Sequence, residues 1–284
     1  MGADSALIDR QESGEDLQTQ TPIKISNVMH PREATSLARE LESVKDPLAI
    51  EEIEWVHDDA PVLPDTICRF TNVKKIEFRA CAYTSLPSAF GNLEKLEELK
   101  IKYCKLTALP QTFGNLRRLR VLYLQSSKVT ALPWSFCRLK ALETLFLTFS
   151  GLEALPEDFG GLESLDFACL AGNKLKSLPE SFGNLVKLTG CTLSLNPDLI
   201  SLPASFSNLA KLRWLEVRGI PGLKFDDALA RLPGLQYIYL DEQQAATFPE
   251  GLKSALNSRG CKVFYEMRIE DDLDDTYRLE NREL

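Results

Sequence analysis

The sequence predicts an α/β solenoid, a right-handed horseshoe with about ten short parallel strands on its concave face. The first observation is a Leu-Pro pair that returns every 23 residues, at Leu63-Pro64, Leu86-Pro87, Leu109-Pro110, Leu132-Pro133, Leu155-Pro156 and Leu178-Pro179. The second is an LxxLxL run in each unit, whose last two leucines alternate as in a strand with one buried face. A single unit cannot bury its own apolar face, so each must stack on its neighbours.

The third observation is a phenylalanine that recurs with the same period and should form a buried spine behind the strands. Its positions are Phe90, Phe113, Phe136, Phe159, Phe182 and Phe206. Burial of each ring stabilises the fold by roughly 1.5–3 kcal/mol. The stack is therefore expected to hold together without a metal ion or a disulfide, and cofactors of any kind are not expected.

The expected strands can be placed one by one from the repeat. Their cores are Ile50–Trp55, Ile76–Phe78, Leu99–Ile101, Leu122–Leu124, Leu145–Leu147, Ala168–Leu170, Cys191–Leu193, Leu215–Val217, Ile238–Leu240 and Cys261–Val263. After each strand comes an Asn position, where an amide side chain would hydrogen-bond the turning backbone. Asn173 and Asn196 occupy it in two units, Cys81 and Cys104 in two others, and Ile220 interrupts the series.

The two ends of the chain depart from the repeat. Residues 34–44 show helical spacing of apolar side chains and should cap the first coil, and residues 249–260 should form a second capping helix. The expected organisation is a disordered acidic segment 1–29, a cap helix and degenerate first repeat 30–62, repeats 63–248, a capping helix and strand 249–265, and an acidic tail 266–284.

The net charge of −8 is concentrated in the tails. Residues 1–30 hold five acidic and two basic side chains, and residues 266–284 hold eight acidic and three basic ones, so the body is neutral. Nucleic acid and anionic membranes both require a basic face. The balance therefore argues against either as a partner, and no apolar run approaches the ~20 residues of a membrane span.

The unit LPxxFGNLxxLxxLxLxxNxLxx, over about residues 41–265, resembles the 23-residue class of leucine-rich repeats. That class occurs in intracellular Ras-group proteins of animals, in their plant relatives and in many bacterial proteins. The resemblance implies recognition of another protein through the concave sheet, as a scaffold or adaptor in signal transduction. The chain is expected to be cytoplasmic and monomeric.

Residues for catalysis are scarce, which favours a protein that is not an enzyme. Only His30 and His57 are present, and Cys169 is the only cysteine expected to face the groove, five strands from His57 or about 24 Å at ~4.8 Å per strand. A Cys-His pair needs hydrogen-bond contact. The acidic run EDDLDD lacks the spaced pattern of a calcium loop.

The concave positions divide into a charged part and an aromatic part. Early strands place there Glu52, Glu54, Lys74, Lys75, Glu77, Arg79, Glu97, Glu98, Lys100 and Lys102. Later ones place there Tyr123, Phe146, Phe149, Phe167, Trp214, Tyr237 and Tyr239. Because interfaces are enriched in aromatic residues, these seven are the predicted protein-binding site. The alternative is that the rings pack on one another, or are covered by the tails, and bind nothing.

Two functions remain open at this point. The first is a non-enzymatic protein-binding module. The second is a bacterial or host-directed effector, or a regulatory subunit of an enzyme complex such as a ubiquitin ligase.

Overall fold

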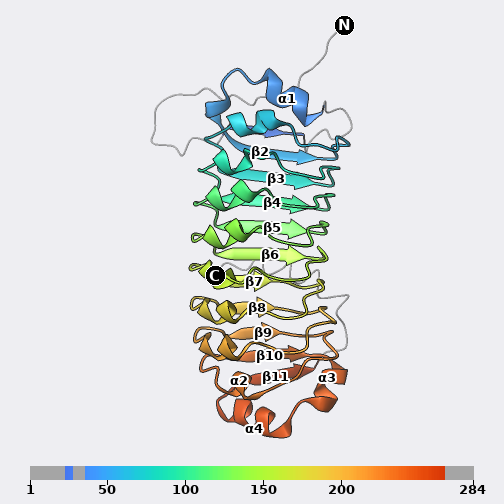
Figure 1. The fold of residues 1–284 in the computed structure, drawn as a ribbon, viewed down its shortest axis with the longest axis vertical. Coiled ribbons are helices and arrows are strands. Elements are labelled where there is room, and N and C mark those ends of the chain that lie inside the picture. Colours follow the sequence, from blue (N-terminus) through green and yellow to red (C-terminus); the bar gives the residue numbers. More distant parts are fainter. Residues whose placement is uncertain (1–22, 28–35, 266–284) are drawn as a thin grey trace, which may run out of the picture.

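The computed structural model describes residues 23–27 and 36–265, in which eleven strands form one open parallel sheet. The strands follow one another in sequence order along the sheet (Figure 1). They are β1 Ile23–Ser26, β2 Ile50–Val56, β3 Lys75–Arg79, β4 Glu98–Lys102, β5 Val121–Gln125, β6 Thr144–Thr148, β7 Phe167–Cys169, β8 Gly190–Thr192, β9 Trp214–Glu216, β10 Tyr237–Leu240 and β11 Lys262–Tyr265. The predicted solenoid is confirmed.

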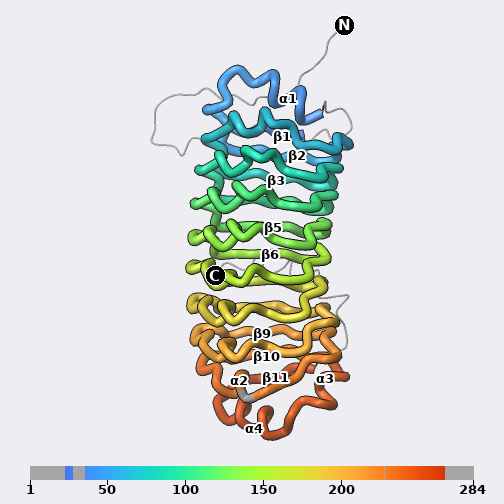
Figure 2. The backbone as a smooth tube through the Cα atoms, in the orientation of Figure 1, coloured from blue at the N-terminus to red at the C-terminus, as the bar shows by residue number. Residues whose placement is uncertain are grey.

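Neighbouring coils lie in register, as the tube through the backbone shows (Figure 2). Leu122 of β5 lies opposite Leu145 of β6, and Leu124 lies opposite Leu147. All four side chains are buried, because alternate strand residues point to the same face. The leucines of the LxxLxL run therefore form continuous buried rows across the sheet.

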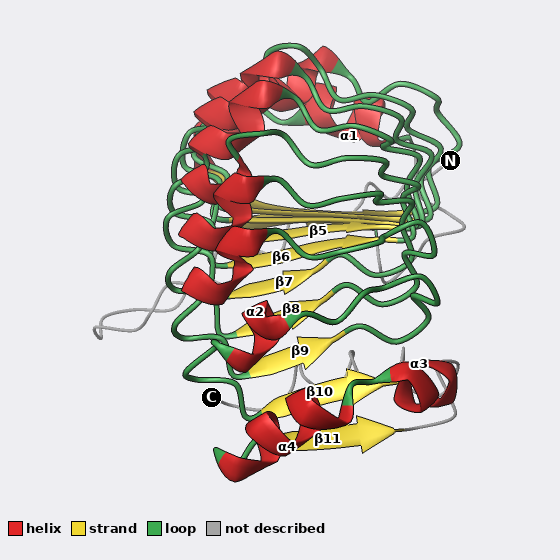
Figure 3. Ribbon diagram, turned by 60° about the horizontal axis from the view of Figure 1, so that its bottom comes forward, coloured by secondary structure: helices red, strands yellow, loops and turns green. Residues whose placement is uncertain are grey.

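Short helices cover the other side of the core from the sheet (Figure 3). The 3-10 helices are η1 Pro47–Ala49, η2 Asp65–Arg69, η3 Phe90–Asn92, η4 Gln111–Asn115, η5 Trp134–Arg138, η6 Phe159–Gly161, η7 Glu180–Asn184 and η8 Ala204–Asn208. Several begin directly after the proline of the Leu-Pro pair, which is the N-cap residue and has an extended backbone. A Cβ on Gly114 of η4 would overlap the carbonyl oxygen of Ser135, so glycine is needed for the close approach of consecutive coils.

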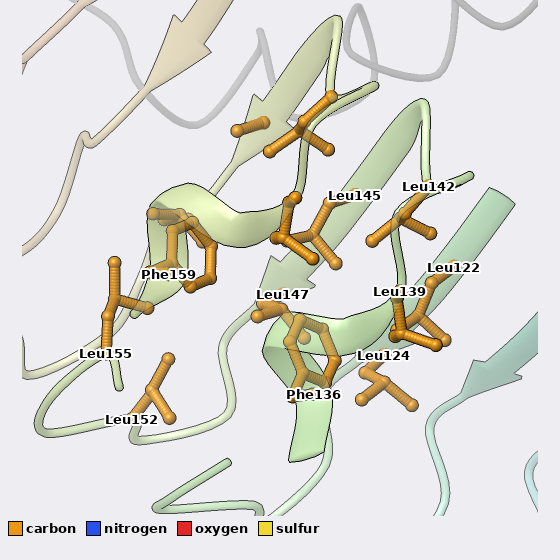
Figure 4. Packing of buried hydrophobic residues seen from close by; sticks show 14 of the residues in the cluster. Leu122, Leu124, Phe136, Leu139, Leu142, Leu145, Leu147, Leu152, Leu155 and Phe159 are labelled. Atoms are coloured by element: carbon orange, nitrogen blue, oxygen red, sulfur yellow. The ribbon is translucent and has the colours of Figure 1, made fainter. Parts of the chain in front are cut away.

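The predicted phenylalanine spine is confirmed. All six rings are fully buried, and those from Phe113 to Phe206 are stacked, with centroids 6.1, 6.5, 5.9 and 5.8 Å apart along the series. Figure 4 shows Phe136 and Phe159 lying among the leucines of their own and adjacent coils. Each ring thus contacts two coils at once, which couples their stability.

The Asn position acts as predicted where asparagine is present. The Asn173 amide donates to the carbonyl oxygens of Leu147 and Leu170, at 2.6 and 2.9 Å. At Ile220, where the sequence predicts an interruption, a different residue takes over. Gln244 donates through Nε2 to the carbonyl oxygens of Val217 and Ile220, at 2.7 and 3.1 Å. The interruption is therefore repaired from the following coil.

The N-terminal end contains one strand more than expected. Residues 23–26, placed by the sequence in a disordered segment, form β1 and pair in parallel with β2. Helix α1, Leu37–Ser43, begins three residues later than the expected helix, and residues 28–35 lie outside the described part. Asp58 accepts from the backbone N–H of Leu37 and from the Tyr83 hydroxyl, which fixes α1 on the first coils.

The C-terminal end closes the stack with three helices and a strand. They are α2 Asp227–Ala230, α3 Glu242–Thr247, which the sequence did not predict, α4 Glu250–Ser258, and β11. Helix α4 buries Leu252 and Leu256, as expected, and Gly260 follows its end with a positive φ of 81°. Residues 1–22 and 266–284, which include most of the predicted acidic segments, lie outside the described part.

Candidate binding face on the concave sheet

The concave face presents three columns of side chains, each running across the strands. The first column is Glu52, Lys75, Glu98, Val121, Thr144, Phe167, Gly190, Trp214, Tyr237 and Lys262. The central column is Glu54, Glu77, Lys100, Tyr123, Phe146, Cys169, Thr192, Glu216, Tyr239 and Phe264. The third column follows the strand ends at Arg79, Lys102, Gln125, Thr148, Ala171, Ser194, Arg218 and Asp241.

The charged part, on β2 to β4, is organised as ion pairs between neighbouring side chains. Lys75 lies 3.5 Å from Glu52, Arg79 lies 3.3 Å from Glu54, and Lys100 lies 2.8 Å from Glu98. Lys24 of β1 also pairs with Glu54. Such partly exposed pairs contribute little to stability, typically below about 1 kcal/mol each. Their effect is to leave this part of the face nearly neutral.

Six rings on the later strands form a continuous row, here named the aromatic ladder. Its members are Tyr123, Phe146, Phe167, Trp214, Tyr239 and Phe264. Successive ring centroids lie 4.3, 5.3, 5.9, 5.9 and 5.0 Å apart. Three of the five contacts are stacked, so the rings turn their faces toward one another and present their edges to a partner. Ring edges carry partial positive charge, which favours contact with carbonyl and carboxylate oxygens.

The end of the ladder at Tyr123 is capped by two cations. The ammonium groups of Lys100 and Lys102 lie 5.3 and 5.1 Å from the centre of the Tyr123 ring. This is within the range of a cation–π interaction. The Tyr123 ring lies between these cations and Phe146, and only 8% of the residue is exposed.

The predicted aromatic residues are only partly gathered at one site. Tyr123, Phe146, Phe167, Trp214 and Tyr239 belong to the ladder, and Tyr237 contacts its last ring, Phe264, at 6.2 Å. Phe149 lies apart, in the turn after β6 with a positive φ of 52°, where its ring packs against Gly172. Tyr123 is buried, because the Phe146 ring stacks on it.

Phe264 belongs to the ladder although the sequence did not predict it. It lies opposite Tyr239, 25 residues later, rather than at the 23-residue interval of most coils. The expected last strand, Cys261–Val263, ends one residue too early to include it. Two signals in the sequence could have identified it. Phe264 lies two residues after Lys262 and therefore shares its face of the strand, and it is aromatic.

A buried polar cluster interrupts the central column between Phe146 and Tyr239. Arg218 donates through Nε to Glu216 Oε1 at 2.8 Å, and its Nη2 lies 2.6 Å from the same oxygen. The Thr192 hydroxyl donates to Glu216 Oε2 at 3.1 Å. Both oxygens of this carboxylate are thus paired, as burial of a charge requires.

No catalytic arrangement is found among the described residues. Within them, no group of three or more histidine, cysteine or acidic residues could hold a metal ion. His57 follows β2 and Cys169 lies on β7, so the two are not brought together. Burial raises the pKa of the Cys169 thiol to about 12, which leaves it protonated and poorly nucleophilic at neutral pH. Across residues 23–27 and 36–265, no helix is both long and apolar enough to cross a membrane.

The chain is similar to known proteins built from the same kind of repeat. A family model described as a leucine-rich repeat region matches residues 111–219. A leucine-rich-repeat protein of Leptospira interrogans is 17% identical over 81% of this chain and 99% of its own, with a TM-score of 0.38. TLR13, in its complex with ssRNA13, is 22% identical over 69% of this chain, with a TM-score of 0.59. This similarity spans 29% of the TLR13 chain. No curated protein matches the sequence.

The ordered parallel sheet, the phenylalanine spine and the family match define the class. The chain folds as a leucine-rich-repeat solenoid, and its residues 111–219 match the family model for a leucine-rich repeat region.

Proposed function

We propose that this protein is a non-enzymatic binding module, a cytoplasmic scaffold or adaptor that holds a protein partner on its concave face. Leucine-rich repeats are generally protein-interaction modules. The observation that carries the proposal is the aromatic ladder, which places six rings in one row on a face that the leucine core does not require to be aromatic. Binding energy in protein interfaces is concentrated in such aromatic residues.

The shape and charge of the face support an elongated protein segment as the ligand. The ladder runs from β5 to β11, across the strands, over about 29 Å at ~4.8 Å per strand. The ion-paired part beside it is close to neutral, which does not suit a phosphate backbone. A protein chain lying along the stack, with its carbonyl oxygens and apolar side chains against the ring edges, meets both conditions.

The proposal is tested by replacing two non-adjacent rings of the ladder, Phe146→Ser and Trp214→Ser, in one chain. A crosslinking pull-down from the native source identifies proteins retained by the wild type and lost by the double variant. Affinity is then measured with purified components. We expect a loss of about 2 kcal/mol or more, roughly 30-fold in Kd.

Phe149→Ser provides the matched control, because this ring is exposed but lies outside the ladder. It should leave the affinity unchanged. Circular dichroism must show that the double variant remains folded. A folded double variant with wild-type affinity would place the interaction elsewhere.

A further inference from the structure

An open cleft lies at the edge of the sheet where strands β8, β9 and β10 begin. Its volume is about 510 Å³, and it is lined by Thr189, Ala210, Lys211, Arg213, Gly234 and Gln236. Thr189, Arg213 and Gln236 directly precede these three strands. The cleft therefore borders the aromatic ladder at Trp214, the residue that follows Arg213.

The cleft exists because two small residues occupy positions that carry longer side chains in earlier coils. Ala210 takes the repeat position of Lys140 and Glu163, and Gly234 takes that of Lys211. A Cβ on Gly234 would lie 2.7 Å from the carbonyl oxygen of Ala210, so even alanine would be crowded there. The coils approach closely at this point, and position 234 contributes no side chain that would fill the space beside Lys211.

Along the same edge, the cations of earlier coils are paired with acidic residues of the neighbouring coil. The pairs are Lys74 with Glu51 at 3.0 Å, Arg120 with Glu143 at 2.8 Å, and Lys140 with Glu163 at 2.6 Å. This pairing stops at the cleft, whose described lining contains no acidic residue. Lys211 and Arg213 are both exposed, and within the described part of the chain neither makes an ion pair or a side-chain hydrogen bond.

The acidic residue that precedes β7 on this edge, Asp166, is engaged elsewhere. Its Oδ1 accepts the hydroxyl of Thr189 at 2.7 Å. Two strand spacings, about 10 Å at ~4.8 Å each, separate its position from that of Arg213. Lys187, in the coil before Lys211, donates to the Ser164 hydroxyl at 3.4 Å and adds further positive charge to this side. The cleft therefore presents cations whose charge no acidic side chain of its lining balances.

We propose that this cleft binds a pair of acidic side chains of the protein partner that lies on the aromatic ladder. Lys211 and Arg213 each bind one carboxylate, and the planar guanidinium of Arg213 suits a carboxylate with two parallel hydrogen bonds. The exposed amide of Gln236 is a further donor beside them. The cleft extends over three strands, which accommodates two side-chain ends rather than one. This inference rests on the proposed function, since it assigns the charge of the segment that crosses the ladder.

A random-peptide library displayed on phage tests the proposal with a defined probe. Peptides retained by the full-length wild type are compared with those retained by a variant carrying Lys211→Glu and Arg213→Glu. We expect the wild type to select two acidic residues next to apolar ones. The variant, in which the charge of the cleft is reversed, should select basic residues instead, because like charges repel. Wild-type peptides without acidic residues, the same peptides from both proteins, or a selection that retains nothing would overturn the proposal.

The affinity of the best acidic peptide is then measured by fluorescence polarisation at ~0.15 M salt. Lys211→Gln together with Arg213→Gln should weaken binding about tenfold. Both side chains are exposed, so the fold should be unaffected. The matched control is Arg117→Gln together with Arg118→Gln, which removes two exposed cations from an earlier coil and should leave the affinity unchanged.

A second peptide, in which the two acidic residues are replaced by their amides, separates a charge contact from a structural effect. It should bind the wild type about tenfold more weakly than the acidic peptide. It should also bind the wild type and the Gln variant of the cleft equally well, because the contact that the variant removes is already absent. Equal losses for both peptides in that variant would overturn the proposal.

A phosphoryl group is the other anion that two cations could bind. The same peptide is therefore made with phosphoserine in place of the acidic residues. We expect it to bind no more tightly than the acidic peptide. Binding that is about tenfold tighter would assign the cleft to a phosphorylated partner and overturn the assignment to carboxylates.

The two proposals can fail separately, because Phe146→Ser alters the ladder on β6 and leaves the cleft at β8 to β10 intact. If Phe146→Ser weakens the acidic peptide and the Gln variant of the cleft does not, the proposed function stands and the cleft is not the site of the acidic residues. If only the Gln variant weakens the peptide, the cleft binds it without the ladder and the proposed function fails. If both proposals hold, both changes weaken the peptide and their effects add.

Discussion

Phe167 and Trp214 stack with centroids 5.9 Å apart although a whole strand, β8, lies between their own strands. Gly190 occupies the position between them in the first column. A Cβ there would lie 2.8 Å from Phe167 Cδ2 and 3.5 Å from Trp214 Cε3. The two rings meet because glycine leaves the space above β8 empty. The aromatic ladder is continuous only through this residue.

Gly190→Ala should therefore separate the two rings while leaving the protein folded. The new methyl group displaces the Phe167 ring and loses a stacking contact of about 0.5–1.5 kcal/mol. The gain from replacing glycine in a strand, roughly 0.5–1 kcal/mol, offsets much of that loss. Urea unfolding should show a net change within about 1 kcal/mol.

The same variant should change the near-ultraviolet circular dichroism of the aromatic side chains and weaken partner binding. Gly222→Ala is the control, since a Cβ on Gly222 would meet no neighbouring group within 4 Å. An unaltered spectrum in Gly190→Ala would show that the ladder does not depend on this gap.

The repeat itself was predictable because its period is visible in residue types that the core requires. Leucine and phenylalanine at fixed intervals determine both which residues are buried and which strands are neighbours. The contact between Phe167 and Trp214 was not predictable in this way. It depends on a missing side chain in a third strand, and on a sheet register that only the folded chain defines.

The ends of the solenoid were harder to predict for a related reason. Residues 23–26 have no place in the 23-residue pattern, and β1 pairs with β2, which would otherwise present an unpaired edge. Gln244 reaches Ile220 from α3, a helix that the repeat does not contain. Both features provide hydrogen-bond partners for backbone groups that would otherwise be unpaired. Which groups need a partner is evident only once the neighbouring coils are in place.

Gln244→Leu should destabilise the protein by about 2–4 kcal/mol. It leaves the buried carbonyl oxygens of Val217 and Ile220 without their donor, and each unpaired group costs about 1–3 kcal/mol. Chemical denaturation should show the loss, and Gln243→Leu, an exposed neighbour on the same helix, should show little of it. Equal effects of the two substitutions would mean that the hydrogen bonds to the preceding coil contribute nothing.

The pH dependence of stability should report the burial of Cys169. Its pKa rises from 9.0 to about 12 on folding, chiefly because burial penalises the thiolate. Since the raised pKa belongs to the folded state, the associated stability is complete below pH 9 and is lost as the pH rises from 9 to 12. The loss is about 1.4 kcal/mol per pH unit.

Between about pH 8 and 10.5 the wild type should lose about 2 kcal/mol more than Cys169→Ala in urea unfolding. Parallel pH profiles for the two proteins would contradict the assignment.

Phe136→Ala should destabilise the protein by about 3–5 kcal/mol, the usual cost of removing a buried ring. Phe113 and Phe159 lie on either side at 6.1 and 6.5 Å and are held in their own coils, so the cavity cannot readily collapse. Trp134→Ala, in the same 3-10 helix, is the control. The Trp134 side chain is 61% exposed and contacts Arg138, so its loss should cost below about 1 kcal/mol. Each coil is stabilised by its neighbours. Denaturation of Phe136→Ala should therefore give the same single transition by fluorescence and by circular dichroism. A loss below about 1 kcal/mol would mean that the spine does not couple the coils.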